Sequence, residues 1–485
     1  MSKVFLPNGM EAVEAEYQTQ PIEEYNNPFI QALPKMQDKE GIVRGLLLNQ
    51  PFNVEERNLD ASIRIHILQR IYKVFLPLPI HLEVWRTIDT LIRQGYVARN
   101  PYDKEYRRYL NEVGGNIAKK AYEINARSSF TTTASCGLLV GFSGMGKTSC
   151  VNRVLSNLPQ IICHNYYNGC HFNQLQLTWM RLEAPSSLKS LAIQFFVKTD
   201  ELLGTNNFKR YMTKNLSTDA LLSLMGVVCN NIGLGLLIID EIQNLNRNSV
   251  SQIMGFLTGL INSCGVPILF IGTPASYYIF SNELRIARRV TGNAEIIWNN
   301  MDNDNQFKLL LKGIWRYQWT RKPTELTEDM VNLFYHLTQG ISDLVVKLFI
   351  NTQKHAIESG SEEINEGLVN KVAEEQFKFI SPMIEAIRSG NEYKINEYED
   401  IRRIDDNIVP NHKDRMDKVS NKNNSSASTL KCLNKNKYKK TELSEDDVRS
   451  IIKRGYENNK TEYDALKEAG VIDDMIWVSG ETDYV

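Results

Sequence analysis

The sequence lacks the features of membrane-spanning, secreted and disulfide-rich proteins. No apolar run reaches the roughly 20 residues that cross a bilayer. Residues 1–7 do not begin an apolar signal-peptide stretch. The seven cysteines are scattered and odd in number, which does not suggest a disulfide framework. We therefore expect a cytoplasmic protein with no membrane partner.

A strong charge of either sign is also missing. The net charge is −1, so any nucleic-acid surface must be local. Hydrophobic residues make up 42% and charged residues 23%, which is ordinary for a globular chain. A length of 485 residues allows roughly two to four domains.

The most informative motif is a glycine-rich stretch at residues 141–148, GFSGMGKT. It fits the phosphate-binding pattern G-x-x-x-x-G-K-[ST] without a departure. An apolar run at 138–140 precedes it and a predicted helix over 147–155 follows, so it has the strand–loop–helix context that the motif needs. Lys147 would reach the β- and γ-phosphates of ATP, and Thr148 would ligate Mg²⁺. The residues expected to hold the nucleotide are Gly141, Ser143, Gly144, Met145, Gly146, Lys147, Thr148 and Ser149.

Two acidic residues follow a second apolar strand, predicted at 234–239. Ligands of open α/β sheets lie at the carboxyl ends of the strands, where Asp240 and Glu241 would stand. Phosphoryl transfer needs a carboxylate to hold the metal, so Asp240 joins Thr148 as a predicted Mg²⁺ ligand. Glu241 would act as the general base that activates the attacking water.

The rest of the chain is predicted to form an α/β core with extensions on both sides. Further strands are expected at 161–166, 174–182, 266–271 and 294–298, and helices at 187–203, 217–230 and 249–262. Residues 381–441 are expected to form a basic linker, since 411–440 holds nine Lys or Arg and two Asp. The expected parts are an N-terminal arm and helices (1–125), the core (126–300), a helical lid (301–380), the linker (381–441) and a partner-binding tail (442–485).

The N-terminal part is predicted to be irregular up to about residue 55, because it is interrupted by Pro21, Pro28, Pro34 and Pro51. Residues 26–30, NNPFI, suggest either a docking peptide or simply a tethered arm. Further on, apolar residues at helical spacing predict a helix over 80–93 that stops at Gly95.

Four possible zinc ligands lie close together at Cys163, His164, Cys170 and His171. Their spacing fits no common zinc finger. Neighbouring residues of a strand point to opposite faces, which separates Cys163 from His164. The pattern therefore favours the interpretation that these four residues do not bind a metal ion.

Beyond the glycine-rich loop, three strings resemble AAA+ ATPases, and within them the TnsC/TniB regulators of DNA transposition. They are LIIDEIQNLN at 237–246, FIGTPA at 270–275 and ARRVTG at 287–292, and the resemblance covers roughly residues 25–375. It implies an AAA+ P-loop core with a helical lid. It also implies a homo-oligomer, a ring or helical filament, on double-stranded DNA that connects a TnsD/TniQ-type target selector to transposase subunits. ATP hydrolysis would control disassembly.

The resemblance also implies roles for single residues. Thr273 would be the sensor of the γ-phosphate or attacking water, and Arg288 and Arg289 would be arginine fingers that reach a neighbouring subunit. The lid lacks the arginine that many AAA+ proteins place just after the glycine at 340, and Lys347 is a weaker substitute.

In family members, the segment after the predicted strand at 174–182 lines a DNA channel. The residues that would contact DNA here are Lys189, Lys198, Lys209, Arg210 and Lys214. The alternative for each is an exposed helix charge. Three other functions stay open: an initiator-like or clamp-loader-like ATPase of replication, a nucleotide-gated scaffold without productive hydrolysis, and a signalling NTPase. The last would need a repeat array, and no internal period is present.

Overall fold

The computed structural model describes residues 2–118, 132–212, 217–246, 249–276 and 294–396, together with Ile279 and Tyr398. The chain divides into two units, Met1–Pro410 and Asn411–Val485, and the second lies outside the described residues. The predicted tail, most of the basic linker, and Arg288, Arg289 and Lys214 are therefore outside the description. Within the described part, no helix is long and apolar enough to cross a bilayer.

A five-stranded parallel sheet forms the core. Its strands, in spatial order, are β6 (Trp179–Glu183), β7 (Leu236–Asp240), β8 (Ile268–Gly272), β3 (Cys136–Gly141) and β9 (Glu295–Trp298). Every residue of β3, β7 and β8 is buried, which explains why these strands are near-continuous apolar runs in the sequence. The predicted α/β core is confirmed.

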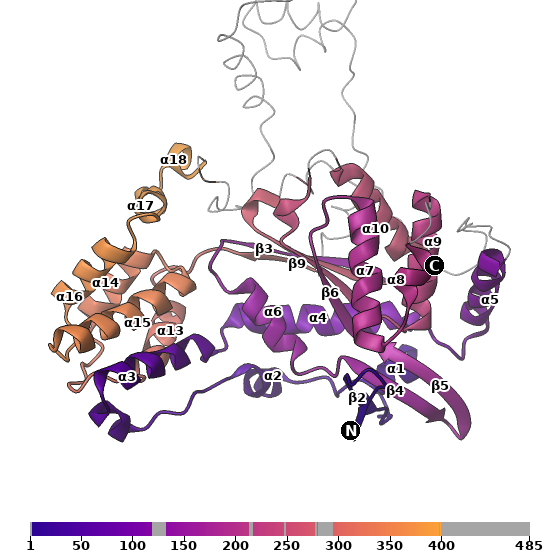
Figure 1. The fold of residues 1–485 in the computed structure, drawn as a ribbon, viewed down its shortest axis with the longest axis horizontal. Helices are drawn as coiled ribbons and strands as arrows, with labels where there is room; N and C mark the ends of the chain where they lie inside the picture. Colours follow the sequence, from indigo (N-terminus) through magenta and orange to yellow (C-terminus); the bar gives the residue numbers. More distant parts are fainter. Residues whose placement is uncertain are drawn as a thin grey trace, which may run out of the picture. The chain divides into compact units, whose positions relative to one another are not determined.

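Helices cover both faces of this sheet, as Figure 1 shows. Leu139 and Ile238 belong to one hydrophobic cluster, while their neighbours Leu138 and Ile239 belong to the other, as alternation along a strand requires. The first face packs on α4 (Pro79–Val97) and α6 (Lys147–Leu155). The second face packs on α7 (Leu188–Leu203), α9 (Thr218–Asn231) and α10 (Val250–Cys264). The short helix α8 (Asn207–Tyr211) contacts α7, and α5 (Lys104–Ala118) contacts α9.

A second, four-stranded sheet shows that the prediction of an irregular N-terminus is wrong. Its order is β1 (Lys3–Phe5), β2 (Glu11–Glu14), β4 (Ile161–Tyr167) and β5 (Cys170–Leu177). The N-terminal strands are short and become part of a sheet because β2 pairs in parallel with β4. The strand predicted at 161–166 is present, but it belongs to this sheet and not to the core sheet.

The single strand predicted at 174–182 is in fact two strands, divided at Thr178. β5 ends at Leu177 in the second sheet, and β6 begins at Trp179 in the core sheet. The N–H of the buried Thr178 donates to the Gln160 carbonyl, 2.8 Å away. Apolar residues stand at 175, 177 and 179 and then at 180 and 182, so the alternation shifts by one residue directly after Thr178, and the prediction of a single strand passed over this shift.

The cysteine–histidine segment lies on the β4–β5 hairpin. His164 is buried, and its ring nitrogens lie 2.8 Å from the Tyr17 hydroxyl and 2.8 Å from Gln176 Oε1. Cys163 is half-buried, whereas Cys170 and His171 are exposed. Among the described residues, no group of three or more His, Cys, Asp or Glu could hold a metal ion.

The segment at residues 26–30 is part of the core, so the interpretation as a docking peptide or tethered arm is wrong. Asn27 is fully buried and begins α1 (Pro28–Gln31), where its side chain accepts a hydrogen bond from the N–H of Phe29. The same side chain donates to the Tyr96 carbonyl on α4, 2.6 Å away. Phe29 and Ile30 are buried in the same hydrophobic cluster as α4.

Helix α4 continues past Gly95, where the sequence predicted its end. A Cβ atom at Gly95 would lie 2.4 Å from Cγ of Pro267, so the glycine allows the close approach of the loop before β8. The glycine therefore reflects packing and does not mark a helix end. α2 (Lys39–Leu46) contacts α4 and α6 on this side of the core.

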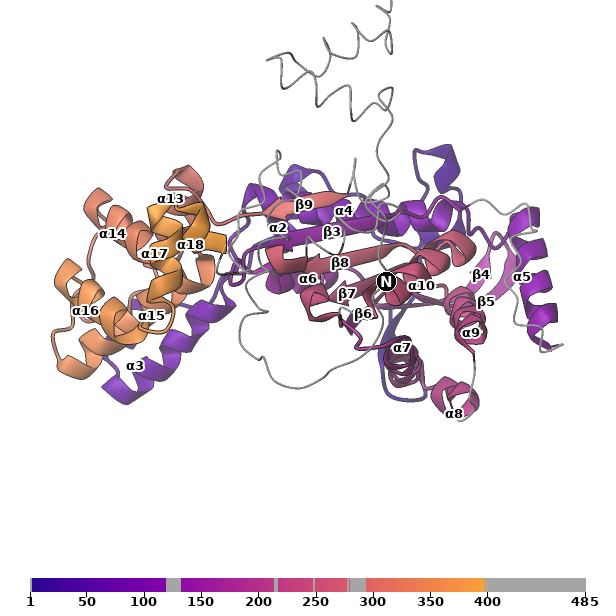
Figure 2. The same cartoon turned by 90° about the horizontal axis from the view of Figure 1, so that it is seen from above.

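The predicted helical lid consists of α13 (Asn305–Trp315), α14 (Glu328–Thr338), α15 (Ser342–Ser359) and α16 (Glu366–Gln376). Two further helices, α17 (Ser381–Ser389) and α18 (Glu392–Asn396), lie where the sequence predicted the start of the linker. Figure 2 shows α3 (Ala61–Ile67) beside α15 of the lid, although α3 comes from the N-terminal part of the chain.

The N-terminal segment 54–73 packs on the lid through η2 (Val54–Asn58), α3 and η3 (Leu68–Lys73). Arg64 is buried and forms a two-bonded ion pair with Glu362, at 2.6 and 2.7 Å. Among the described residues, the chain therefore crosses between core and lid three times, at residues 47–53, 74–78 and 299–304.

Candidate functional site

The phosphate-binding loop connects β3 to α6. Gly144 and Gly146 have φ angles of 81° and 91°, a left-handed region that favours glycine, and α6 begins directly afterwards at Lys147. The Lys147 ammonium group donates to the carbonyls of Gly141 and Phe142, at 2.7 and 2.8 Å. The N-terminus of α6 thus points its free N–H groups and its positive dipole end at the loop, which is the geometry of an anion site.

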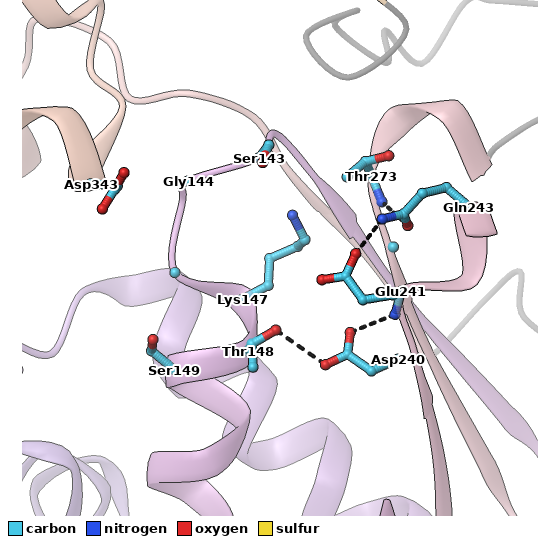
Figure 3. A pocket seen from close by; sticks show the side chains of 12 residues that line it. Ser143, Gly144, Lys147, Thr148, Ser149, Asp240, Glu241, Gln243, Thr273 and Asp343 are labelled. Carbon is cyan, nitrogen blue, oxygen red and sulfur yellow. Dashed lines mark hydrogen bonds between the residues drawn. The ribbon is translucent and has the colours of Figure 1, made fainter. Parts of the chain in front are cut away.

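The predicted metal ligands lie next to each other. The Thr148 hydroxyl donates to Oδ2 of Asp240 over 3.1 Å, and the N–H of Glu241 donates to Oδ1 over 2.8 Å (Figure 3). Asp240 is only 1% exposed, at the carboxyl end of β7. A hydroxyl and a carboxylate oxygen at this separation are hard oxygen donors of the kind that Mg²⁺ prefers, so the residues fit the ion.

Glu241 has an unusual backbone conformation. Its φ angle is 56°, which is left-handed and uncommon for a residue with a side chain. Its carboxylate accepts a hydrogen bond from Nε2 of Gln243, and Oε1 of Gln243 accepts one from the N–H of Thr273 over 3.1 Å (Figure 3). Strained backbone of this kind concentrates at functional sites because the surroundings must hold it.

Thr273 stands at the end of β8, beside β7. Its side-chain oxygen is buried and has no hydrogen-bond partner among the described residues. Buried hydroxyls nearly always have partners, so this atom is ready to bond a group that enters the cavity. Thr273 lines the cavity, and its role as a sensor stays a prediction.

The lid touches the phosphate-binding loop directly. Ser342 donates to the carbonyls of Gly144 and Met145, and the N–H of Asp343 donates to the Gly144 carbonyl over 3.0 Å. Asp343 therefore lines the pocket three residues after Gly340, close to the position of the lid arginine that this sequence lacks. Lys347, the suggested substitute, forms an ion pair with Asp343 at 2.6 Å.

These elements enclose a cavity of about 400 Å³. The sequence identified most of its lining but missed Gln243, Gly272 and Asp343, which line it together with Ser143, Gly144, Gly146, Lys147, Thr148, Ser149, Asp240, Glu241 and Thr273. Of the predicted nucleotide ligands, Gly141 and Met145 do not line the cavity. Met145 is buried beneath the loop, and a Cβ at Gly141 would lie 2.2 Å from the Trp298 carbonyl.

A further residue that the sequence did not single out is Arg181 on β6. Its guanidinium group donates to Oδ2 of Asp240 over 2.5 Å and to Oδ1 of Asn152 over 2.8 Å. The only hint in the sequence is a charged residue in a strand whose neighbours are apolar, and the partner lies 59 positions along the chain.

The residues expected to contact DNA lie on α7 and α8. Lys189, Lys209 and Arg210 are exposed. Lys198 is half-buried and forms an ion pair with Glu201 at 3.0 Å. Arg210 also stacks over the ring of Tyr211, 5.4 Å from its centre.

Comparison with known proteins agrees with this geometry. Residues 130–279 match the family model described as an AAA domain. Over these residues the chain is similar to AAA domains. The predicted AAA+ P-loop core, a parallel sheet flanked by helices, is therefore confirmed. No curated protein matches the chain.

Solved structures with similarity to the chain include the Walker-type ATPase of Pyrococcus abyssi, with 13% identity over 59% of this chain and 75% of that one, at a TM-score of 0.36. The Aeropyrum pernix Orc1 protein in complex with DNA has 16% identity over 61% of this chain and 72% of that one, at a TM-score of 0.34. A Thermotoga maritima RuvB mutant has 15% identity over 57% of this chain and 77% of that one, at a TM-score of 0.30.

Proposed function

We propose that the AAA domain binds ATP together with Mg²⁺ and hydrolyses it. The observation that carries the proposal is the 3.1 Å contact between Thr148 and Asp240, in a cavity that also holds Lys147 and Glu241. The loop N–H groups and the Lys147 ammonium would bind the β- and γ-phosphates. Mg²⁺, held by Thr148 and Asp240, would neutralise the negative charge that develops on the phosphate oxygens.

The remaining residues of the cavity divide the chemistry between them. Glu241 would accept a proton from the attacking water, and Gln243 holds its carboxylate in place. The unpartnered hydroxyl of Thr273 would bond the γ-phosphate or the water. Arg288 and Arg289 would complete the site from a neighbouring subunit, so hydrolysis would depend on assembly.

The larger role that we propose is regulation of DNA transposition. The protein would form a ring or helical filament on double-stranded DNA and connect a TnsD/TniQ-type target selector to transposase subunits. This part is supported by the resemblance of the strings at 237–246, 270–275 and 287–292, and by the exposure of Lys189, Lys209 and Arg210. ATP-bound and ADP-bound states would differ in assembly, and partners would read that difference.

Two substitutions test the nucleotide chemistry. Glu241→Gln should bind ATP but hydrolyse it at least about 100-fold more slowly, because it removes the base and leaves the phosphate ligands. Lys147→Ala should lose ATP binding and assembly on duplex DNA. Glu183→Gln is a matched control, since this exposed carboxylate lies opposite Asp240 on β6. Turnover of Glu241→Gln at the parent rate would refute the assignment of the base, and undiminished assembly of Lys147→Ala would refute nucleotide control.

The DNA surface has its own test. The double change Lys209→Ala and Arg210→Ala should flatten the dependence of DNA affinity on salt by about one to two units of slope. Lys371→Ala is the control, because this exposed lysine lies on α16, outside α7 and α8. An unchanged slope would remove α8 from the DNA surface. Binding that strongly prefers one DNA sequence would favour an initiator of replication instead.

A further inference from the structure

The guanidinium group of Arg181 lies on the carboxylate that is expected to hold the metal. Arg181 stands opposite Ile238 in the register of β6 and β7, so its side chain shares a sheet face with Ile238 and with Asp240 two residues further on. Nη2 donates to Oδ2 of Asp240, and Nη1 donates to Asn152 on α6. The guanidinium group of Arg181 is therefore held by hydrogen bonds to both Asp240 and Asn152.

The oxygen that Arg181 contacts is the one that faces Thr148. Oδ1 of Asp240 is taken by the N–H of Glu241, whereas Oδ2 accepts from both Thr148 and Arg181. The Asp240 side chain is 2% exposed and that of Arg181 27%. A buried carboxylate needs a cation or several hydrogen bonds to be stable, and here the protein supplies both.

We propose that Arg181 is a cationic placeholder at the metal site, which deepens the proposed function and rests on it. In the metal-free protein, Arg181 neutralises Asp240 and repels a second cation from the same oxygen. A bare divalent ion is therefore bound weakly, and the ion enters together with the triphosphate, whose negative charge outweighs that of the guanidinium. Arginine suits this position because it stays charged at any relevant pH and its fork bonds two partners at once.

The test measures binding of Mn²⁺, as a spectroscopic substitute for Mg²⁺, to the full chain without nucleotide by electron paramagnetic resonance. Arg181→Met should bind Mn²⁺ about fivefold or more tightly than the parent, because a unit charge a few ångströms from a divalent ion is removed. Arg181→Lys keeps the charge and should stay within about twofold of the parent. Arg153→Met is the matched control, since its guanidinium on α6 bonds the Leu46 carbonyl and not the site.

Thermal unfolding of each variant checks that the protein is folded. The variant Asp240→Asn separates the placeholder role of Arg181 from the proposed metal site itself. Unchanged or weaker Mn²⁺ binding by folded Arg181→Met would overturn the placeholder, while the metal site stands if Asp240→Asn loses Mn²⁺. If Asp240→Asn binds Mn²⁺ with a non-hydrolysable ATP analogue as tightly as the parent does, the metal site of the proposed function is wrong.

Discussion

Replacing Gln243 by leucine would test how Glu241, the proposed general base, is held. The orientation of the Gln243 side-chain amide is fixed. Its oxygen accepts a hydrogen bond from the N–H of Thr273, so its nitrogen must face Glu241. Leucine has a similar volume and neither group. The change therefore frees the Glu241 carboxylate without opening a cavity.

The size of the effect follows from the hydrogen bond that is lost. A hydrogen bond to a charged group contributes about 1.5–3 kcal/mol, and 1.4 kcal/mol corresponds to a factor of ten. If that energy serves to orient the base, kcat should fall roughly 10- to 100-fold. KM should stay within about a factor of three, because the phosphate ligands on the loop and α6 are untouched.

Steady-state phosphate release with and without duplex DNA measures both constants. Gln174→Leu is the control, since this glutamine lies on β5 and bonds the Asn231 carbonyl, away from the cavity. A rise in KM with unchanged kcat would show that Gln243 binds substrate and does not orient the base. An unchanged kcat would refute the reasoning.

Two further predictions concern stability. Burial lowers the pKa of His81 and of His164 from 6.5 to about 4. Each folded-state pKa lies below the unfolded value, so each ring contributes stability that is present above about pH 6.5 and lost as the pH falls towards 4. Between pH 7 and pH 5 the two rings should together cost about 4 kcal/mol in urea unfolding, and His164→Gln should remove about half of that difference. An unchanged pH dependence in this variant would contradict the assignment. Arg64→Met should destabilise the lid by about 3–5 kcal/mol because Glu362 loses its buried partner, and adding Glu362→Met should recover most of it. Equal thermal stability of the single and double variants would refute this.

The residues of the candidate nucleotide site were largely predictable because their signals are local. Lys147 and Thr148 follow their glycines at fixed spacing, and Asp240 directly follows an apolar strand. The structure only had to bring the ends of β3 and β7 together, which parallel strands of one sheet do. Arg181 and Gln243 were missed because their partners are set by which strands and turns become neighbours, and one sequence does not state this.

The larger errors arose where short elements depend on distant partners. β1 and β2 hold three and four residues, too few for a clear alternation, and they are strands only because β4 pairs with β2. The strand at 174–182 was wrongly joined because no loop residues separate its two halves, and the shift in alternation between Trp179 and Met180 is a weak sign of the break. Gly95 resembled a helix end because the sequence does not show the proline that packs against it.

The three crossings between the core and the helices of the lid limit how nucleotide turnover could reshape the protein. A part attached by a single linker swings freely, whereas three covalent connections restrict how far the lid can turn away from the core. Because Ser342 and Asp343 bond the glycine loop directly, a displacement of that loop would pass to α15, the helix in which both residues lie. Helix α15 is thus the place to attach spectroscopic labels that would report nucleotide binding at the proposed site.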